Sequence, residues 1–422
     1  MNTNKTIGLL WAISIWIGWM VGGGIFAVLW EAVSLAHWAT AIAFAIAGLV
    51  AFFTAYSYTK LSVKYQSEGW TVTFIDKAFG NNILSGSINL MLWLCYIVTI
   101  SLYATAFAYY WETFFTYKSE LIHHVLISFA IIFPAIINLI SASFVGKSET
   151  IIVIIKVSLL ALVILAGASH VDTKVMSPEN WASTTSIVVA GMIIFVAYEG
   201  FELIANSAED IKNPNKNLPR AFYSSVIIVI ALYILISIIT VGSVPEDTLM
   251  KAKDYALAVA AKPALGHVWF VIVASAALLS TFSAINATIY GNARLWYIIA
   301  KDGKLPKSLM RSKRDIPFMG ILYTTIFSLI LANSINLNQI AIIGSAWFLL
   351  IFFIVNISAY KLHKEINANK IILIISSNLS FLALFILLYH TYTAKPLALI
   401  IFISFIFISI IFELLYGRYF RG

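Results

Sequence analysis

Gly18-Trp-Met-Val-Gly-Gly-Gly-Ile-Phe26 places three consecutive glycines, Gly22 to Gly24, inside an apolar stretch that covers residues 7–31. Each glycine costs about 1 kcal/mol relative to alanine in a helix interior, so this segment unwinds easily. Backbone that unwinds inside a membrane is tolerated only where it is buried in protein or lines a polar cavity. The stretch therefore predicts a broken helix beside a polar site. Close packing of helices through small residues is the alternative explanation.

The composition of the whole chain is that of a membrane protein. Of its 422 residues, 61% are hydrophobic and 11% are charged, and the mean hydropathy is +0.92. In soluble domains about a quarter of the residues are charged. A spanning helix needs about 20 mostly apolar residues, and we find about twelve such stretches, at 7–31, 37–62, 83–112, 121–140, 149–169, 184–208, 219–243, 267–299, 318–333, 338–360, 370–390 and 396–416. They lack the alternation of barrel strands, so the expected fold class is an all-α membrane protein of about twelve transmembrane helices.

The connections between these stretches are short, and their charges predict an orientation. None reaches the 50 or more residues of a separate domain, so residues 1–422 are expected to form a single membrane unit. Nineteen of the 27 lysines and arginines lie at the two ends and in the connections on the same side, against six on the other side. This bias predicts a multi-pass protein of the cell (plasma) membrane with both termini cytoplasmic. The first stretch lacks a small-residue cleavage site and is expected to be retained.

Several classes of function find no support in the sequence. The basic residues that give the net charge of +8 do not follow one face, so no nucleic-acid partner is expected. Cys95 is the only cysteine, and the seven histidines show no metal-ligand spacing, so no metal site or cofactor is predicted. No nucleophile–base constellation and no phosphate-binding loop stands out. An enzyme and an ATP-driven pump are therefore disfavoured.

A second interruption, Tyr198-Glu-Gly-Phe-Glu202, lies in the sixth stretch. Corresponding interruptions in two halves of a transporter indicate a binding site at mid-membrane depth. Amide N–H groups near Gly22 to Gly24 would attract a carboxylate, and carbonyls released at both breaks would hold an ammonium. The predicted ligand is therefore a molecule with both charges at amino-acid spacing. The expected substrate-binding residues are Ile17, Met20, Val21, Gly22, Gly23, Gly24, Val196, Ala197, Tyr198 and Glu199.

Lys156 lies within an apolar run from Ile151 to Leu165. A lysine near the centre of a spanning helix costs about 2.5 to 3.5 kcal/mol on insertion scales, and it persists by facing a polar cavity, by pairing, or by losing its proton. Such a group can titrate during a transport cycle. The alternative is that the side chain extends to the cytoplasmic interface, since Lys156 lies roughly 13 Å beyond Lys147 at 1.5 Å per residue.

Three segments resemble the amino acid-polyamine-organocation transporter superfamily. Gly22-Gly-Gly-Ile-Phe26 is similar to its Gly-Ser-Gly-Ile-Phe signature, with Gly23 in place of serine. Phe195 to Ala221, which includes Asn213-Pro and Leu218-Pro, resembles its sixth helix and the following loop, and Asn286 to Pro306 resembles its eighth helix. The resemblance implies a LeuT-like fold with inverted five-helix repeats at about 7–169 and 184–360 and two extra helices at about 370–416.

The same resemblance implies roles for individual residues. A lysine in the fifth helix is similar to that of archaeal proton-coupled amino-acid transporters, where the ammonium takes the place of sodium. Lys156 would then face the Gly18 carbonyl region and the hydroxyls of Ser280 and Ser283. Glu202 is expected in a proton relay or in orienting the break, and Glu199 near a substrate ammonium or a cationic side chain. The candidate gating residues are Phe195, Phe201, Tyr290 and Arg294, although Arg294 is also explained by extension to the interface.

The function that these observations favour is proton-coupled symport of an amino acid by alternating access. A neutral substrate side chain is expected because Glu199 is the one fixed counter-charge in evidence. The alternatives are an exchanger of amino acids or polyamines, a sodium symporter, and a nutrient sensor that binds without transport. The predicted partners are the amino acid, protons and the lipid bilayer, and the sequence does not fix an oligomeric state.

Overall fold

The computed structural model describes residues 7–66, 70–140, 142–203, 205, 211–305, 310 and 317–420. Residues 1–6 and 421–422, on which the predicted position of the termini depends, lie outside this part, as do several basic residues between 306 and 316. The described chain is helical, and its pairing of extended backbone is limited to the isolated bridges Ile7–Ile211 and His37–Trp181. The all-α fold class predicted from the sequence is therefore confirmed.

The helices follow the predicted stretches closely. They are α1 Leu9–Met20, α2 Gly24–Ala36, α3 Thr40–Lys64, α4 Trp70–Phe79, α5 Ile83–Glu112, α6 Glu120–Ile140, α7 Ala142–Gly167, η1 Ala168–His170, η2 Pro178–Asn180, α8 Thr184–Ile193, η3 Ile194–Tyr198, α9 Pro214–Ser243, α10 Glu246–Ala252, η5 Lys253–Tyr255, α11 Ala256–Ala260, α12 Lys262–Lys301, α13 Phe318–Ser334, α14 Leu337–Lys361, α15 Lys370–Ala394 and α16 Pro396–Phe420.

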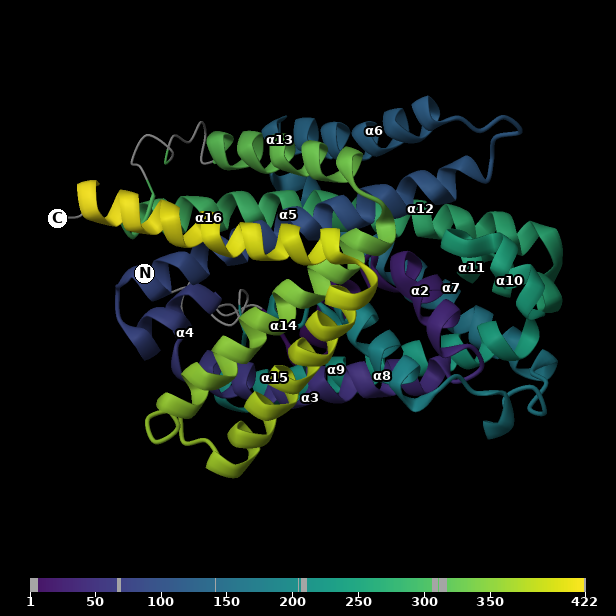
Figure 1. The fold of residues 1–422 in the computed structure, drawn as a ribbon, viewed down its shortest axis with the longest axis horizontal. Helices are drawn as coiled ribbons and strands as arrows, with labels where there is room; N and C mark the ends of the chain where they lie inside the picture. The colour runs from purple at the N-terminus through teal and green to yellow at the C-terminus, as the bar shows by residue number, and fades with distance from the viewer. Residues whose placement is uncertain are drawn as a thin grey trace.

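Nine of the described helices are long and apolar enough to cross a membrane, and the bent pair α1 and α2 makes a tenth span. Thr184–Tyr198 and Phe318–Ser334 are apolar but shorter. Each predicted stretch thus contains a helix, while the total of twelve spans stays a prediction. α4 and the C-terminal end of α16 lie at one end of the bundle, and α10 and α11 lie at the other end (Figure 1). We call the end that carries α4 the N-terminal face and the other the opposite face.

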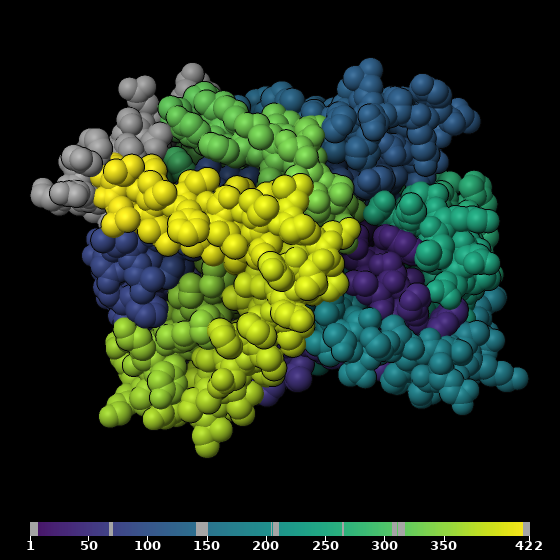
Figure 2. Space-filling view, viewed as in Figure 1, coloured from purple at the N-terminus to yellow at the C-terminus, as the bar shows by residue number. Residues whose placement is uncertain are grey.

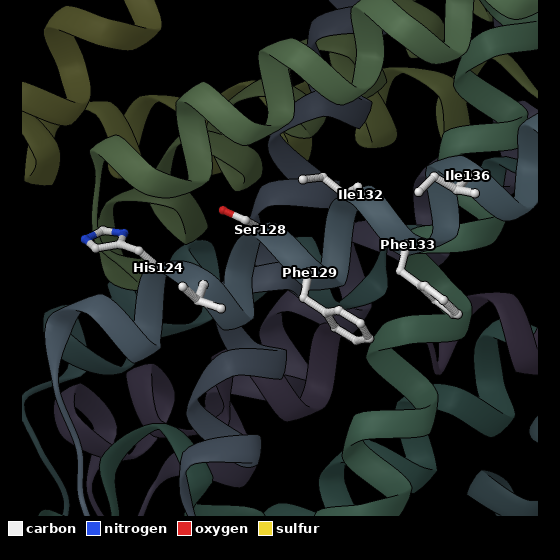
Figure 3. A pocket seen from close by; sticks show the side chains of 7 residues that line it. His124, Ser128, Phe129, Ile132, Phe133 and Ile136 are labelled. Carbon is white, nitrogen blue, oxygen red and sulfur yellow. The ribbon is translucent and has the colours of Figure 1, made fainter.

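The outer helices present apolar side chains, as expected for contact with lipid. α15 and α16 lie across the near side of the molecule (Figure 2), and they carry exposed Phe381, Phe385 and Phe407. α6 has a similar surface, along which the side chains from His124 to Ile136 line a shallow pocket (Figure 3). This pocket belongs to the apolar exterior, because Phe129, Ile132 and Phe133 in it are exposed.

α5 is the central helix, because 94% of its most apolar 18-residue stretch is buried inside the bundle. The helices around it pack in corresponding pairs. α3 packs against α9, α5 against α12, and α6 against α13. α1 contacts α7 and α9, and the segment α8 with η3 contacts α14 and α3. α7 contacts α12 and α9, and α14 contacts α5 and α3. These contacts of the first five membrane segments therefore have counterparts among the next five.

Two of the membrane segments are broken at the positions predicted from the sequence. α1 and α2 meet at an angle of 51°. At the end of α1 the amide of Gly22 bonds to the Trp19 carbonyl at 3.2 Å, not to that of Gly18. In the other segment α8 tightens into η3, and Gly200, with φ of +113°, ends it. Only glycine adopts this backbone conformation without strain.

Gly200→Ala is expected to lower the free energy of unfolding by about 1 to 3 kcal/mol, because a Cβ would force strained backbone. That Cβ would also lie 2.9 Å from the Trp19 carbonyl oxygen. The measurement is the thermal unfolding midpoint of purified protein in detergent. Gly291→Ala is the matched control, since a Cβ there meets nothing within 4 Å and alanine favours a helix. An unchanged midpoint for Gly200→Ala would show that this break is not constrained as described.

Candidate functional site

The two breaks lie in direct backbone contact at the centre of the bundle. A Cβ on Gly24 would be 2.7 Å from the Cα of Ala197, and one on Gly200 would be 3.1 Å from the Cα of Met20. Side chains at either glycine would push the segments apart. Gly24 and Gly200 are therefore explained by the close approach of the two breaks to each other.

Hydroxyl groups from three other helices satisfy the interrupted backbone. Ser280 of α12 donates to the carbonyl of Gly22 at 2.8 Å. Tyr233 of α9 is placed to donate to the carbonyls of both breaks, at 2.9 Å from Met20 and 3.1 Å from Ala197. Ser345 of α14 accepts from the Val196 amide at 2.9 Å and donates to the Ile193 carbonyl at 2.5 Å. Buried backbone groups need such partners, so these hydroxyls make the broken geometry sustainable.

Sequence reasoning did not identify Tyr233 or Ser345. Both lie in long apolar helices, and neither has a neighbour in the sequence that marks it as functional. Ser280 was expected near the first break, and it lies there, although it contacts the Gly22 and Val21 carbonyls rather than that of Gly18. Ser283 is buried on the same helix.

The N-terminus of α2 has an unusual environment for a helix start. Gly23 is the N-cap residue, and no side chain caps it. The amide groups of a helix N-terminus carry a partial positive charge that attracts anions. The ring of Tyr103 lies against this turn, since a Cβ on Gly23 would be 2.4 Å from the Tyr103 Cδ1 atom. Glycine in place of the family's serine thus lets an aromatic ring approach the backbone.

Glu199 lies next to this turn. Its side chain is 3% exposed, and its Oε2 atom accepts a hydrogen bond from the Tyr103 hydroxyl at 3.0 Å. Tyr103 therefore connects the carboxyl group of the second break to the glycines of the first. Val196, Ala197 and Tyr198 precede it and are fully buried. The structure thus brings the predicted substrate-binding residues of both breaks together. The Ile17 carbonyl accepts one bond, from the Val21 amide at 2.8 Å.

Glu202 points toward the N-terminal face from the same turn. Its Oε2 atom accepts from the Gly200 amide at 2.8 Å, and Tyr96 donates to Oε1 at 3.5 Å. An aromatic cluster of Tyr58, Phe201 and Phe352 follows, with ring centroids 4.9 to 5.6 Å apart. Phe195 joins the cluster through Phe352 at 5.8 Å. Phe195 and Phe201 therefore lie where a closed gate on the N-terminal-face side would be.

Lys156 lies on α7, which packs against both α1 and α12. Val153, one turn before it, fills the space beside Gly18, where a Cβ would be 2.1 Å from a Val153 methyl group. The side chain of Lys156 is 2% exposed. A lysine that extended to the interface would expose its ammonium group, so this burial favours the other explanation.

Tyr290 and Arg294 lie apart from these residues. Arg294 is exposed on α12, and its guanidinium lies 5.8 Å from the centre of the Tyr290 ring. The two residues stack on each other. Within the described part of the chain, this stacking is the contact that the structure shows for the pair.

Acidic groups also gather near the opposite face. Glu112 pairs with His123 at 2.7 Å beside a cleft of about 680 Å³ that Asn333 also lines. Asn338 donates a hydrogen bond to Glu31 of α2. η5, in the connection between α9 and α12, packs against α2 and α5, and burial raises the pKa of its Asp254 to about 6. The segment Pro245 to Ala261 has helical periodicity in the sequence but too many charges to span a membrane. It thus packs over α2 and α5 at the opposite face.

Tyr233→Phe is expected to destabilise the fold by about 1 to 3 kcal/mol, because two buried carbonyls lose their shared donor. The thermal unfolding midpoint of the purified protein measures this. Tyr389→Phe, on an exposed tyrosine of α15, is the control and should leave the midpoint unchanged. Equal midpoints for the two variants would mean that the hydroxyl of Tyr233 does not hold the breaks together.

Comparison with known proteins gives a consistent result. The model of the amino acid permease family matches residues 12–413. An uncharacterized protein of Methanocaldococcus jannaschii is 34% identical over 417 residues, which cover 98% of this chain and 96% of the relative. The inner membrane transport protein YbaT of Escherichia coli is 33% identical over 420 residues, or 99% and 97% of the two chains.

A more distant relative is the branched-chain amino acid permease BcaP of Bacillus subtilis, which is 24% identical over 377 residues, or 83% of this chain and 79% of the relative. The family model and the first two relatives extend over nearly the whole sequence. The protein therefore belongs to the amino acid permease family, within the amino acid-polyamine-organocation superfamily.

Proposed function

We propose that this permease carries neutral amino acids together with protons by alternating access, with the substrate held between the two breaks. The observation that carries the proposal is the uncapped N-terminus of α2 beside the buried carboxyl group of Glu199. One end of this site attracts an anion and the other a cation. An α-amino acid carries both charges on adjacent atoms.

The substrate carboxylate would bind the amides of Gly23 and Gly24, in the place that a capping side chain occupies in other helices, because the Gly22 amide already bonds to the Trp19 carbonyl. The ammonium would bind carbonyls of η3. The Ala197 carbonyl accepts from Tyr233, but a carbonyl oxygen has two lone pairs and can accept a second bond. The name of the Bacillus subtilis relative, a branched-chain amino acid permease, agrees with an apolar substrate side chain.

The proposed architecture is one unit over residues 1–422, with inverted repeats at about 7–169 and 184–360 and α15 and α16 added at about 370–416. The corresponding packing pairs of the first and second five membrane segments support it. Both termini are proposed to be cytoplasmic in the cell membrane. The charge bias supports this. The Escherichia coli relative is named as an inner membrane protein.

Lys156 is proposed to couple transport to protons. Its charged form would stabilise the contact of α7 with α1 and α12, much as a bound cation would, and loss of the proton would weaken that contact. The burial of Lys156 and the packing of Val153 on Gly18 support the proposal. Glu202, bonded to Gly200 and Tyr96, is proposed to relay the proton toward the N-terminal face.

Glu199 favours a second candidate function. A buried carboxyl group at the site would also bind a cationic side chain, as an exchanger of basic amino acids or polyamines requires. Exchange in proteoliposomes without a pH gradient distinguishes the two functions. A symporter needs the gradient for accumulation, whereas an exchanger needs only solute on the opposite side.

Lys156→Ala is expected to abolish accumulation of a neutral amino acid in proteoliposomes with an acid exterior. The variant should still bind the amino acid within about threefold of the parent, because Lys156 would act through helix contacts rather than on the substrate. Uptake by the parent should not change when choline replaces sodium. Lys60→Ala, which removes a lysine that bonds to the Asn367 carbonyl, is the matched control.

Full accumulation by Lys156→Ala would exclude Lys156 as the coupling group. Loss of uptake in choline would instead indicate a sodium symporter. Binding without flux in the parent would indicate a sensor. Each outcome thus separates one of the alternatives that the sequence leaves open.

A further inference from the structure

α4 closes the N-terminal-face end of the route that leads from Glu202. The helix connects α3 to α5 and packs against α14 and α5. It contacts the aromatic cluster directly, since Thr71 lies 3.0 Å from the Tyr58 hydroxyl and Phe74 packs on the Tyr58 ring at 6.0 Å. Any opening toward this face must therefore move α4 relative to its neighbours.

A partly buried ion pair connects α4 to the end of α12, since Lys304 is buried and the Asp76 side chain is 25% exposed. The Nζ atom of Lys304 lies 2.5 and 2.6 Å from the two carboxylate oxygens of Asp76. Lys304 is 1% exposed, and Asn89 of α5 donates to the same carboxylate at 3.3 Å. Hydrogen bonds between charged groups are stronger than hydrogen bonds between neutral groups. Among the described residues, Lys301 and Asp302 are charged groups near the pair.

The sequence after α12 positions Lys304 for this contact. Gly303, with φ of +77°, reverses the chain, and its amide bonds to the Ala300 carbonyl at 3.1 Å. The Lys304 amide bonds to the Ile299 carbonyl at 3.0 Å. These two bonds form a Schellman motif, which fixes the residue after the glycine against the last helical turn. Lys304 is thus directed back toward the bundle instead of into solvent.

We propose that the Asp76–Lys304 ion pair is the latch that holds α4 across the N-terminal-face end of the transport route. The proposal rests on the proposed transport function. Both residues are positioning residues, because neither contacts the broken segments. The pair forms when this face is closed and separates when α4 moves to open it. Lys361, whose Nζ lies 4.3 Å from the centre of the Phe79 ring, holds the same C-terminal end of α4 to α14.

Cys95 provides a reporter of this opening that does not depend on transport. It is the only cysteine of the chain and is fully buried on α5. Its thiol has Glu199 and Glu202 among its electrostatic neighbours, and it precedes Tyr96, which bonds to Glu202. A water-soluble maleimide can therefore reach Cys95 from the N-terminal face only after α4 and the aromatic cluster separate.

The experiment measures the rate of Cys95 modification in full-length protein in lipid nanodiscs. Lys304→Met and Asp76→Asn should each raise the rate about tenfold or more, because a charged hydrogen-bonded pair no longer favours the closed state. The exchange of both charges, Asp76→Lys with Lys304→Asp, should return the rate toward that of the parent. Lys60→Ala, which removes a lysine that bonds to the Asn367 carbonyl instead of to Asp76, should label as the parent does.

Parental labelling rates in both Lys304→Met and Asp76→Asn would overturn the proposal. So would a charge-exchanged variant that labels as fast as the single variants while its thermal unfolding midpoint equals that of the parent, because the attraction between the charges would then be irrelevant. Absence of proton-driven uptake in the parent would contradict the proposed function alone. The labelling result would still decide the role of the ion pair.

Discussion

The structure depends on the requirement that every backbone group freed at the two breaks finds a partner inside the protein. Neither lipid nor an apolar core can supply that partner. Ser280, Tyr233 and Ser345 supply it from three different helices, and Tyr233 serves both breaks at once. The amides at the start of α2 are the groups that no side chain caps. They are thus the natural place for a ligand with a negative charge.

Close packing gives the same region its shape. Gly24 allows α2 to touch Ala197, and Gly23 allows the Tyr103 ring to lie on the turn. Tyr103 then connects this turn to Glu199, and Glu202 continues toward the aromatic cluster and α4. Polar groups thus follow one another from the centre of the bundle to the N-terminal face. Alternating access in this arrangement requires the hydroxyl contacts of the breaks to remain while the cluster and α4 separate.

Much of this could be predicted from the sequence because the relevant signals are local. Consecutive glycines mark the first break, Glu199-Gly-Phe marks the second, and long apolar stretches mark the helices. Tyr233 and Ser345 could not be found in this way, because they lie 213 and 149 residues from the backbone groups they satisfy. The same is true of Lys304 and Asp76, which are 228 residues apart. For Arg294 the sequence left a gating role and extension to the interface open, and the structure places it exposed on α12.

The most direct test of the central claim is an experimental structure of the protein with a neutral amino acid bound. The substrate carboxylate should lie within hydrogen-bond distance of the amides of Gly23 and Gly24, and its ammonium should lie beside the carbonyls of η3 and Glu199. A substrate bound elsewhere, or one bound with its carboxylate away from α2, would contradict the conclusion that the paired breaks form the transport site.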